Sequence, residues 1–151
     1  MTDAAPIGQM APLRPPVAPA TPGRPDAIAL LAQARAMLAE AAGERRAGDR
    51  FRVAHLAALR ISAGVFAERG RPAGTRRRLI SAWVLLRTVA PELAEWSEYF
   101  AAGAAARAAV EAGALSAVST RQADDQVRAA TEFLHVVEGS LGLLSPALAA
   151  S

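Results

Sequence analysis

The sequence predicts an all-α fold, an up-and-down bundle of four to five helices. The chain is 52% hydrophobic and only 5% aromatic, and alanine is its dominant residue. Alanine favours helices, whereas β-sheets prefer β-branched and aromatic side chains. Apolar residues recur at spacings of three and four, and short connections between such segments make neighbouring helices antiparallel. The length of 151 residues allows one domain with a single core.

The chain divides into an N-terminal tail, a bundle and a short C-terminal tail. Residues 1–24 contain six of the ten prolines and few large apolar side chains. Such a segment cannot bury enough surface to offset the entropy of ordering, so we expect a disordered tail. It is either a linker or a segment that binds a partner. The predicted bundle covers residues 25–142, and residues 143–151 form the C-terminal tail.

The first two helices are separated by a short polar connection. Asp26 can cap a helix that ends near Gly43, and Asp49 can cap a second helix that ends at Gly70. Both segments place apolar residues along one stripe, which is typical of a helix with one face in a core. The residues expected to face the core are Ile28, Leu30, Leu31, Ala34, Leu38 and Ala41 in the first helix and Phe51, Ala54, His55, Ala58, Ile61, Ser62 and Val65 in the second.

An arginine-rich loop separates these helices from the rest of the bundle. Residues 70–78 read GRPAGTRRR, and their glycines, proline and four arginines predict an exposed loop. Pro91 suits the first turn of a helix, and Ser119 with Gln122 matches the S-x-x-Q capping box at the start of another. The helices expected after the loop span about residues 79–89, 91–113 and 120–138.

Composition excludes several classes of protein. The chain has no cysteine, which rules out a disulfide scaffold, a thiolate nucleophile and a cysteine-based metal site. With only two histidines, we expect no metal and no cofactor. The N-terminus lacks the basic and apolar regions of a signal peptide, and no apolar run reaches the roughly 18 to 20 residues of a membrane span. We therefore expect a cytoplasmic protein without a membrane partner.

All seventeen basic residues are arginine, and their distribution is uneven. Residues 44–78 contain ten arginines and three acidic residues, a balance of +7, whereas residues 88–151 contain three arginines and eight acidic residues, a balance of −5. A basic half attracts nucleic acid or nucleotides through their phosphates. Two oppositely charged halves also attract each other in an oligomer, or attract an acidic partner protein. The sequence leaves both alternatives open.

Two groups of arginines are candidate phosphate sites. With Asp49 as the cap, Arg50 and Arg52 would lie in the first helical turn, where the helix dipole repels a cation and attracts an anion. Solvated arginines are an equally acceptable interpretation of both groups. The candidates for anion or nucleic-acid binding are Arg45, Arg46, Arg50 and Arg52 around this helix start and Arg76, Arg77 and Arg78 in the loop.

Three segments carry a family resemblance. They read RFRVAHLAALR at residues 50–60, SAWVLL at residues 81–86 and PELAEW at residues 91–96. Together they resemble an actinobacterial family of HEPN domains, a name that stands for higher eukaryotes and prokaryotes nucleotide-binding. The resemblance covers about residues 26–139 and implies a compact helical bundle that is often a homodimer. It also implies membership of a superfamily that includes RNA-cleaving toxins and noncatalytic nucleotide or RNA binders. A partner protein in DNA repair is implied as well.

Active HEPN ribonucleases carry the pattern R-x4–6-H. The histidine moves a proton at the ribose 2′-hydroxyl or the leaving oxygen, and the arginine stabilises charge on the phosphate, so no metal is needed. The pattern occurs here as Arg50 with His55 and as Arg128 with His135. In both pairs an apolar residue follows the arginine, where the family usually has a polar one. The alternative for each histidine is packing in the core or at its boundary.

The aromatic residues form a stripe on two predicted helices. Trp96, Tyr99 and Phe100 recur at i, i+3 and i+4, and Trp83 lies on the preceding helix. This spacing is typical of core packing, and a homodimer interface is the alternative.

These observations predict a noncatalytic HEPN-like domain that binds RNA, DNA or a nucleotide through its basic half, as a homodimer. Two alternatives remain. One is a metal-independent ribonuclease that uses Arg50 and His55. The other is a helical protein-interaction module associated with DNA repair, in which the proline-rich tail and the aromatic stripe matter more than the arginines.

Overall fold

The computed structural model describes residues 23–72 and 80–143. Within these ranges the chain forms helices and no strand, which confirms the predicted all-α fold. The tail up to residue 22, the arginines at 76 to 78 and the C-terminal residues from 144 lie outside the described residues. The elements are α2 (Arg24–Gly43), α3 (Ala47–Arg69), α4 (Ala82–Val89), the 3-10 helix η3 (Pro91–Leu93), α5 (Ala94–Ala102), α6 (Ala104–Glu111) and α7 (Thr120–Ser140).

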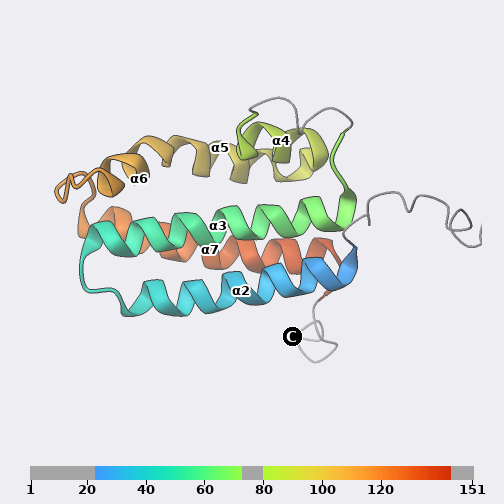
Figure 1. The fold of residues 1–151 in the computed structure, drawn as a ribbon, viewed down its shortest axis with the longest axis horizontal. Coiled ribbons are helices and arrows are strands. Elements are labelled where there is room, and N and C mark those ends of the chain that lie inside the picture. Colours follow the sequence, from blue (N-terminus) through green and yellow to red (C-terminus); the bar gives the residue numbers. More distant parts are fainter. Residues whose placement is uncertain (1–22, 73–79, 144–151) are drawn as a thin grey trace, which may run out of the picture.

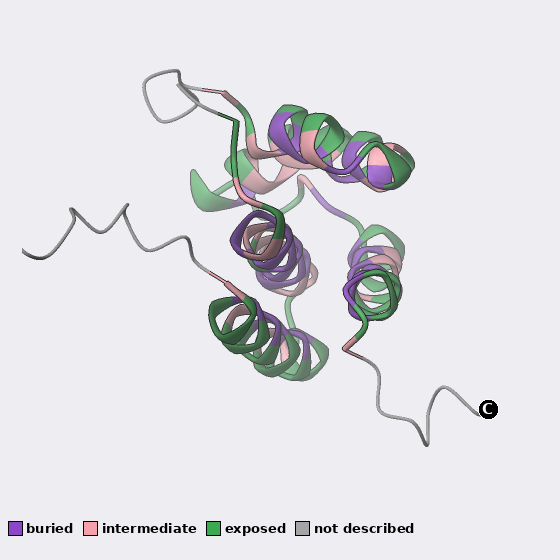
Figure 2. Cartoon of the chain, turned by 90° about the vertical axis from the view of Figure 1, so that its right-hand side faces the viewer, coloured by how far each residue is buried: buried purple, intermediate pink, exposed green. Residues whose placement is uncertain are grey.

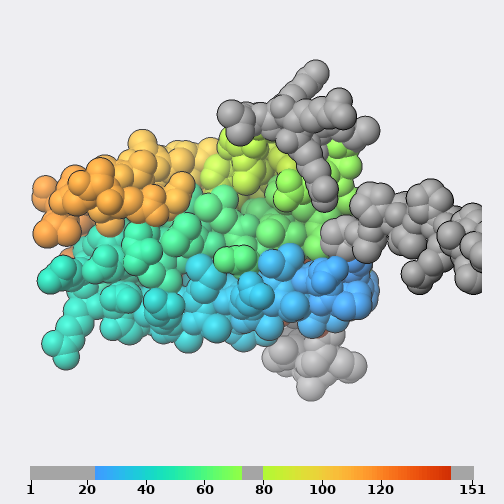
Figure 3. Space-filling view, viewed as in Figure 1, coloured from blue at the N-terminus to red at the C-terminus, as the bar shows by residue number. Residues whose placement is uncertain are grey.

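Helix α3 lies at the centre of the bundle (Figure 1). It packs against α2 and α7, and against α4 and α6 of the layer formed by α4, α5 and α6. The view along the bundle shows the buried sides of α2, α3 and α7 turned toward one another (Figure 2). The space-filling view shows α2, α3 and the α4–α6 layer in continuous contact across one face (Figure 3). No helix among the described ranges is long and apolar enough to cross a membrane.

The starts of α2 and α3 differ from the prediction. Gly23 and Arg46 occupy the N-cap positions, and their backbone carbonyls accept from the N–H groups of Ala27 and Arg50, but neither helix start has a side-chain cap. Asp26 and Asp49 lie inside the first turns instead of capping them, so both predicted caps are wrong. The two aspartates still mark the helix starts, because an acidic side chain stabilises the positive end of a helix anywhere in the first turn.

The buried stripe of α2 is narrower than predicted. Its buried residues follow alternating spacings of four and three from Ala27 to Ala41, which is a single row against α3. Ile28 and Leu30 lie beside this row; Ile28 is 50% exposed, so its assignment to the core is wrong, whereas Leu30 is half-buried. The predicted core face of α3 is confirmed: Phe51, Ala54, His55, Ala58, Ile61, Ser62 and Val65 are all buried.

The single helix predicted over residues 91–113 is broken into η3, α5 and α6. The break between α5 and α6 lies at Gly103, which packs directly against α3. A Cβ atom at this position would lie 3.1 Å from Cζ of Phe51 and 3.5 Å from Nδ1 of His55. The missing side chain therefore allows the α5–α6 junction to approach the two rings. The helix is interrupted at this point of close packing.

Candidate functional site

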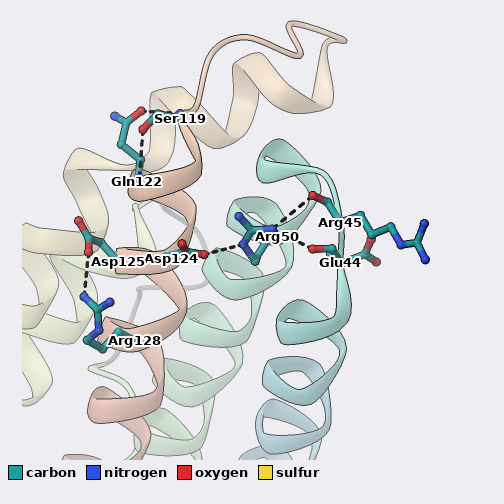
Figure 4. A network of polar contacts seen from close by, with 8 residues as sticks. All are labelled: Glu44, Arg45, Arg50, Ser119, Gln122, Asp124, Asp125 and Arg128. Carbon is teal, nitrogen blue, oxygen red and sulfur yellow. Dashed lines mark hydrogen bonds and ion pairs between the residues drawn. The ribbon is translucent and has the colours of Figure 1, made fainter.

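Arg50 joins three parts of the bundle. Its Nη1 donates hydrogen bonds to the backbone carbonyls of Glu44 at 2.9 Å and Arg45 at 3.4 Å. Its Nε lies 3.0 Å from Oδ1 of Asp124 in α7, an ion pair without the alignment of a hydrogen bond (Figure 4). The carbonyls at the C-terminal end of a helix lack intrahelical partners, and Arg50 supplies one just beyond the end of α2. Its guanidinium is therefore engaged inside the molecule.

The partner of Arg50 on α7 is held in place by a capping box. Ser119 Oγ accepts from the backbone N–H of Gln122 at 3.1 Å, and Gln122 Oε1 accepts from the N–H of Ser119 at 2.8 Å. This confirms the capping box predicted from the sequence. Both residues appear with Asp124 in Figure 4. The box fixes the start of α7, and Asp124 lies within its next turn.

The basic and acidic segments of the sequence are partly neutralised within the fold. The pair of Arg50 with Asp124 and the pair of Arg69 with Glu92 each join residues 44–78 to residues 88–151. Opposite charges separated along the chain are thus brought together by the packing of α3 against its neighbours. The attraction between the two halves operates inside one molecule, in addition to any role in partner binding.

His55 lies in the core, surrounded by rings. Its side chain is 0% exposed, and its ring centroid lies 5.6 Å from that of Trp83 and 6.4 Å from that of Phe100. Nδ1 lies 3.2 Å from Nε2 of Gln126, while Nε2 of the imidazole has no hydrogen-bond partner. Burial, and secondarily the positive charge of Arg107, lowers the pKa of His55 to about 4. The imidazole is therefore neutral at pH 7 and enclosed.

The structure does not bring Arg50 and His55 together. The guanidinium of Arg50 reaches toward the end of α2 and toward α7, whereas the imidazole of His55 contacts Gln126 and the aromatic rings. A general acid or base must come within hydrogen-bond reach of the substrate. The catalytic assignment of this pair stays a prediction, and the geometry of the single chain disfavours it.

The second pair, Arg128 and His135, lies on the surface. Arg128 Nη1 donates to Oδ1 of Asp125 at 2.8 Å, and Nδ1 of His135 lies 3.9 Å from Oε1 of Glu138. Seven positions separate the two residues, which is about 10.5 Å along a helix, and they make no contact with each other. The expectation that His135 packs in the core or at its boundary is wrong, because its side chain is 64% exposed on the outer face of α7.

The predicted aromatic stripe divides between core and surface. Trp83 and Phe100 are buried, with ring centroids 5.3 Å apart. Trp96 is partly buried and stacks on Phe133 of α7 at 5.5 Å, whereas Tyr99 is 43% exposed. Core packing therefore explains the positions of Trp83 and Phe100, and it explains why Trp96 is partly buried. Tyr99 remains available at the surface.

Several arginines have no acidic partner within the described chain. Arg45 and Arg46 are exposed in the connection between α2 and α3, and Figure 4 shows the side chain of Arg45 pointing away from the helices. Arg52 lies in the second turn of α3, and the exposed Arg121 lies in the first turn of α7. The ion pair between α3 and the start of α7 shows that these two helix starts lie at the same end of the bundle. We call this group, Arg45, Arg46, Arg52 and Arg121, the arginine end.

Arg121 is not among the candidate residues predicted from the sequence. It lies in a stretch rich in acidic residues, and only the packing of α7 parallel to α3 brings it to the arginine end. A cation in the first turn of a capped helix is an available signal, because that position is electrostatically unfavourable without an anion. The carboxylates of Glu44 and Asp49 also lie at this end without ion pairs, so four arginines and two acids leave a local charge of +2. Arg60 and Arg87 also lack acidic partners, but they lie elsewhere on α3 and α4.

Comparison with known proteins identifies the family. Residues 41–138, more than half of the chain, match the SAV_6107-like HEPN family. No curated protein and no solved structure gave a significant match. Over the residues that the structure describes, no group of three or more His, Cys, Asp or Glu side chains is arranged to hold a metal ion. The matched range runs from the end of α2 almost to the end of α7 and contains all three segments that carry the resemblance, so the chain belongs to the SAV_6107-like HEPN family.

Proposed function

We propose that this HEPN domain is a noncatalytic module that binds the phosphates of nucleic acid at the arginine end. The observation that carries this proposal is the distribution of arginine partners. Arg50 is taken up by the carbonyls after α2 and by Asp124, whereas Arg45, Arg46 and Arg121 around it are exposed and have no ion pair among the described residues. Free guanidinium groups clustered at one end of a bundle are suited to phosphate oxygens.

The helix starts support the same ligand. The positive ends of α3 and α7 lie at the arginine end, and each helix start presents backbone N–H groups. Arg50 acts there as a positioning residue, because it holds the carbonyls of Glu44 and Arg45 and thereby fixes the connection that carries the free arginines. We expect contacts with phosphates and none with base edges, so that binding is independent of sequence.

His55 supports the noncatalytic part of the proposal. A ribonuclease of the R-x4–6-H type needs an imidazole that reaches the ribose and exchanges a proton near neutral pH. His55 is fully enclosed, and its pKa of about 4 keeps it unprotonated at neutral pH. Its burial among Phe51, Trp83 and Phe100 is the environment of a packed core residue.

The experiment is a salt titration of binding to a fluorescein-labelled oligonucleotide. Neutralising the arginine end with Arg45→Ala, Arg46→Ala and Arg121→Ala together is expected to flatten the plot of log affinity against log salt by roughly 0.7 to 0.9 per lost contact. The matched control is Arg60→Ala, which removes an exposed and unpaired arginine from the middle of α3. We expect this control to keep the wild-type slope.

Two outcomes of this titration would contradict the proposal. An equal loss in Arg60→Ala would show diffuse attraction to the whole surface, and an unchanged slope in the triple variant would remove the arginine end as the site. The loop arginines predicted from the sequence, Arg76, Arg77 and Arg78, are replaced in a parallel variant to measure their share. The homodimer and the DNA-repair partner that the family resemblance implies stay predictions.

A further inference from the structure

Helices α5 and α7 run in opposite directions and contact each other through aromatic rings. Trp96 of α5 stacks on Phe133 of α7. Toward the start of α7, partial burial and the nearby carboxylate of Asp125 raise the pKa of Tyr99, and Arg128 opposes this effect. At the other end Arg69 of α3 pairs with Glu92 next to α5 and donates to Ser140 Oγ of α7. Side chains of α5 and α7 therefore meet at Trp96 and Phe133, and Arg69 of α3 bridges the two elements beyond the start of α5.

An apolar strip follows this line of contact. It consists of Trp96 and Tyr99 from α5 with Ala129 and Val136 from α7, and we call it the α5–α7 strip. Trp96 and Ala129 are partly buried, while Tyr99 is 43% and Val136 38% exposed. Across the described ranges the indole N–H of Trp96 and the hydroxyl of Tyr99 make no hydrogen bond. The strip combines aromatic surface with two unused donors.

A carboxylate without an ion pair lies on each side of the strip. Glu95 directly precedes Trp96 on α5, and Glu132 lies one helical turn before Val136 on α7. Both side chains are exposed, and neither pairs with a cation in the described part of the chain. The neighbouring acids Asp125 and Glu92 are both paired with arginines. The strip therefore fits an apolar ligand that carries a positive charge.

The chain itself contains such a segment. Residues 11–20 read APLRPPVAPA, with four prolines, one arginine and no acidic residue. Proline-rich segments favour the polyproline II conformation, and they bind to strips of aromatic side chains that donate to their free carbonyls. Arg14 is the only basic side chain among the first 22 residues, and it lies between Pro12 and Pro15. The prolines of this segment are suited to pack on the aromatic rings of the strip, and its arginine is suited to pair with the flanking carboxylates.

The attachment point of this segment lies near one end of the strip. Arg24, at the start of α2, donates from Nη2 to the backbone carbonyl of Leu141 at 3.0 Å. From Leu141 back to Glu132 is nine residues of helix, or about 14 Å. The nine residues that separate Arg14 from Gly23 span up to about 28 Å in polyproline II. The segment is therefore long enough to lie along the strip of its own chain, where the linkage provides a high effective concentration.

We propose that the α5–α7 strip binds residues 11–20 of the same chain, with the prolines against Trp96 and Tyr99 and Arg14 between Glu95 and Glu132. The surface involved lies along the side of the bundle and contains none of the four residues of the arginine end. The inference is therefore independent of phosphate binding, and either can fail without the other. An external protein that competes for residues 11–20 would uncover the strip.

Paramagnetic relaxation tests this contact in the full chain. The protein has no cysteine, so Gly8→Cys provides one site for a nitroxide next to the segment. In ¹⁵N-labelled protein we expect selective broadening of the Trp96 indole signal and of the amides around Tyr99 and Val136. Amides on the exposed face of α2 are expected to stay sharp.

Charge reversal provides the matched variants. Arg14→Glu is expected to reduce the broadening at the strip to background, and addition of Glu95→Arg and Glu132→Arg to that variant is expected to restore it. Glu40→Arg, which alters an exposed and unpaired acid on α2, serves as the control for net charge and should restore nothing. No local broadening at the strip, or equal broadening on α2, would overturn the proposal. Broadening seen only between spin-labelled and ¹⁵N-labelled copies would place the segment of a second copy there and overturn the same-chain contact.

Discussion

Two regions of the molecule carry the R-x4–6-H pattern: one contains Arg50 and His55, the other Arg128 and His135. Their side chains lie in opposite environments, the first inside the bundle and the second on its surface. In the first region the histidine is fully buried and the arginine links α2 to α7. In the second region both side chains lie on the outer face of α7, and each lies close to an acid on its own helix. The spacing fixes positions along a helix, whereas the packing of that helix decides which positions are accessible.

The difference arises from the helices that carry the pairs. α3 is central and is covered by α2, α4, α6 and α7, so almost any residue on its inner faces is enclosed. α7 packs against α2 and α3 and leaves its outer face free. A polar residue on α3 must find partners inside the bundle, as His55 does with Gln126. The same residue type on α7 remains in water, and the two regions therefore respond differently to substitution.

The largest effect is expected from His55→Ala. Removal of a fully buried ring leaves a cavity among Trp83 and Phe100 and deprives Gln126 of its partner, so we expect a loss of about 2 to 4 kcal/mol in the free energy of unfolding. His135→Ala, the matched surface substitution, is expected to change it by less than about 0.5 kcal/mol. Urea denaturation measures both. Similar values for the two variants would contradict the difference in burial.

We expect the decrease in stability at acid pH to follow the titration of His55. Because its pKa is about 4 in the folded protein and 6.5 in the unfolded chain, its contribution is fully present above pH 6.5. As the pH falls from 6.5 toward 4, the unfolded chain takes up a proton that the folded protein does not, and stability decreases by up to about 1.4 kcal/mol per pH unit. Unfolding curves at several pH values measure this slope. In His55→Gln the slope between pH 6.5 and 4 should be shallower, and an unchanged slope would mean that His55 titrates normally.

Arg50→Ala is expected to cost about 1 to 2 kcal/mol. The substitution leaves the carbonyl of Glu44 and the carboxylate of Asp124 without their partner. A double-mutant cycle with Asp124→Ala separates the ion pair from the carbonyl contacts. If the cycle assigns all of the loss to Asp124, the role of Arg50 at the end of α2 is refuted. Amide exchange in the connection at Arg45 should rise in Arg50→Ala as well.

The smallest effect is expected from Arg128→Ala. Its ion pair with Asp125 is exposed and lies within one helix, so the loss should stay below about 0.5 kcal/mol. Thermal unfolding of this variant beside Arg50→Ala compares the two arginines directly. A loss as large as that of Arg50→Ala would show that the second region is more ordered than its exposure indicates.

Local features of the fold were predictable from the sequence. The capping box of Ser119 and Gln122 depends on residues three positions apart, and the confirmed core face of α3 repeats over about four turns, from Phe51 to Val65. The prediction failed where a neighbouring helix decides the outcome. Ile28 has the right spacing for a core residue, but the contact of α2 with α3 is one row wide. The break at Gly103 reflects close packing against rings in α3 that are remote in the sequence.

The candidate site was predictable only in part. Arg45 and Arg46 are recognisable as exposed arginines in a polar connection, but the ion pair of Arg50 with Asp124 joins residues 74 positions apart. Arg121 becomes part of the arginine end through the same packing. Charge composition indicates that a region attracts phosphate. The selection of the arginines that remain free for it depends on long-range ion pairs that spacing cannot show.

The most direct test of the proposed function follows the fluorescence anisotropy of a labelled single-stranded RNA with the protein at low salt in EDTA for an hour. We predict a stable rise, which Arg45→Ala combined with Arg46→Ala and Arg121→Ala diminishes. A rise that decays as the RNA is cleaved, and that no longer decays in His55→Gln, would contradict the account by showing that the buried imidazole reaches the substrate.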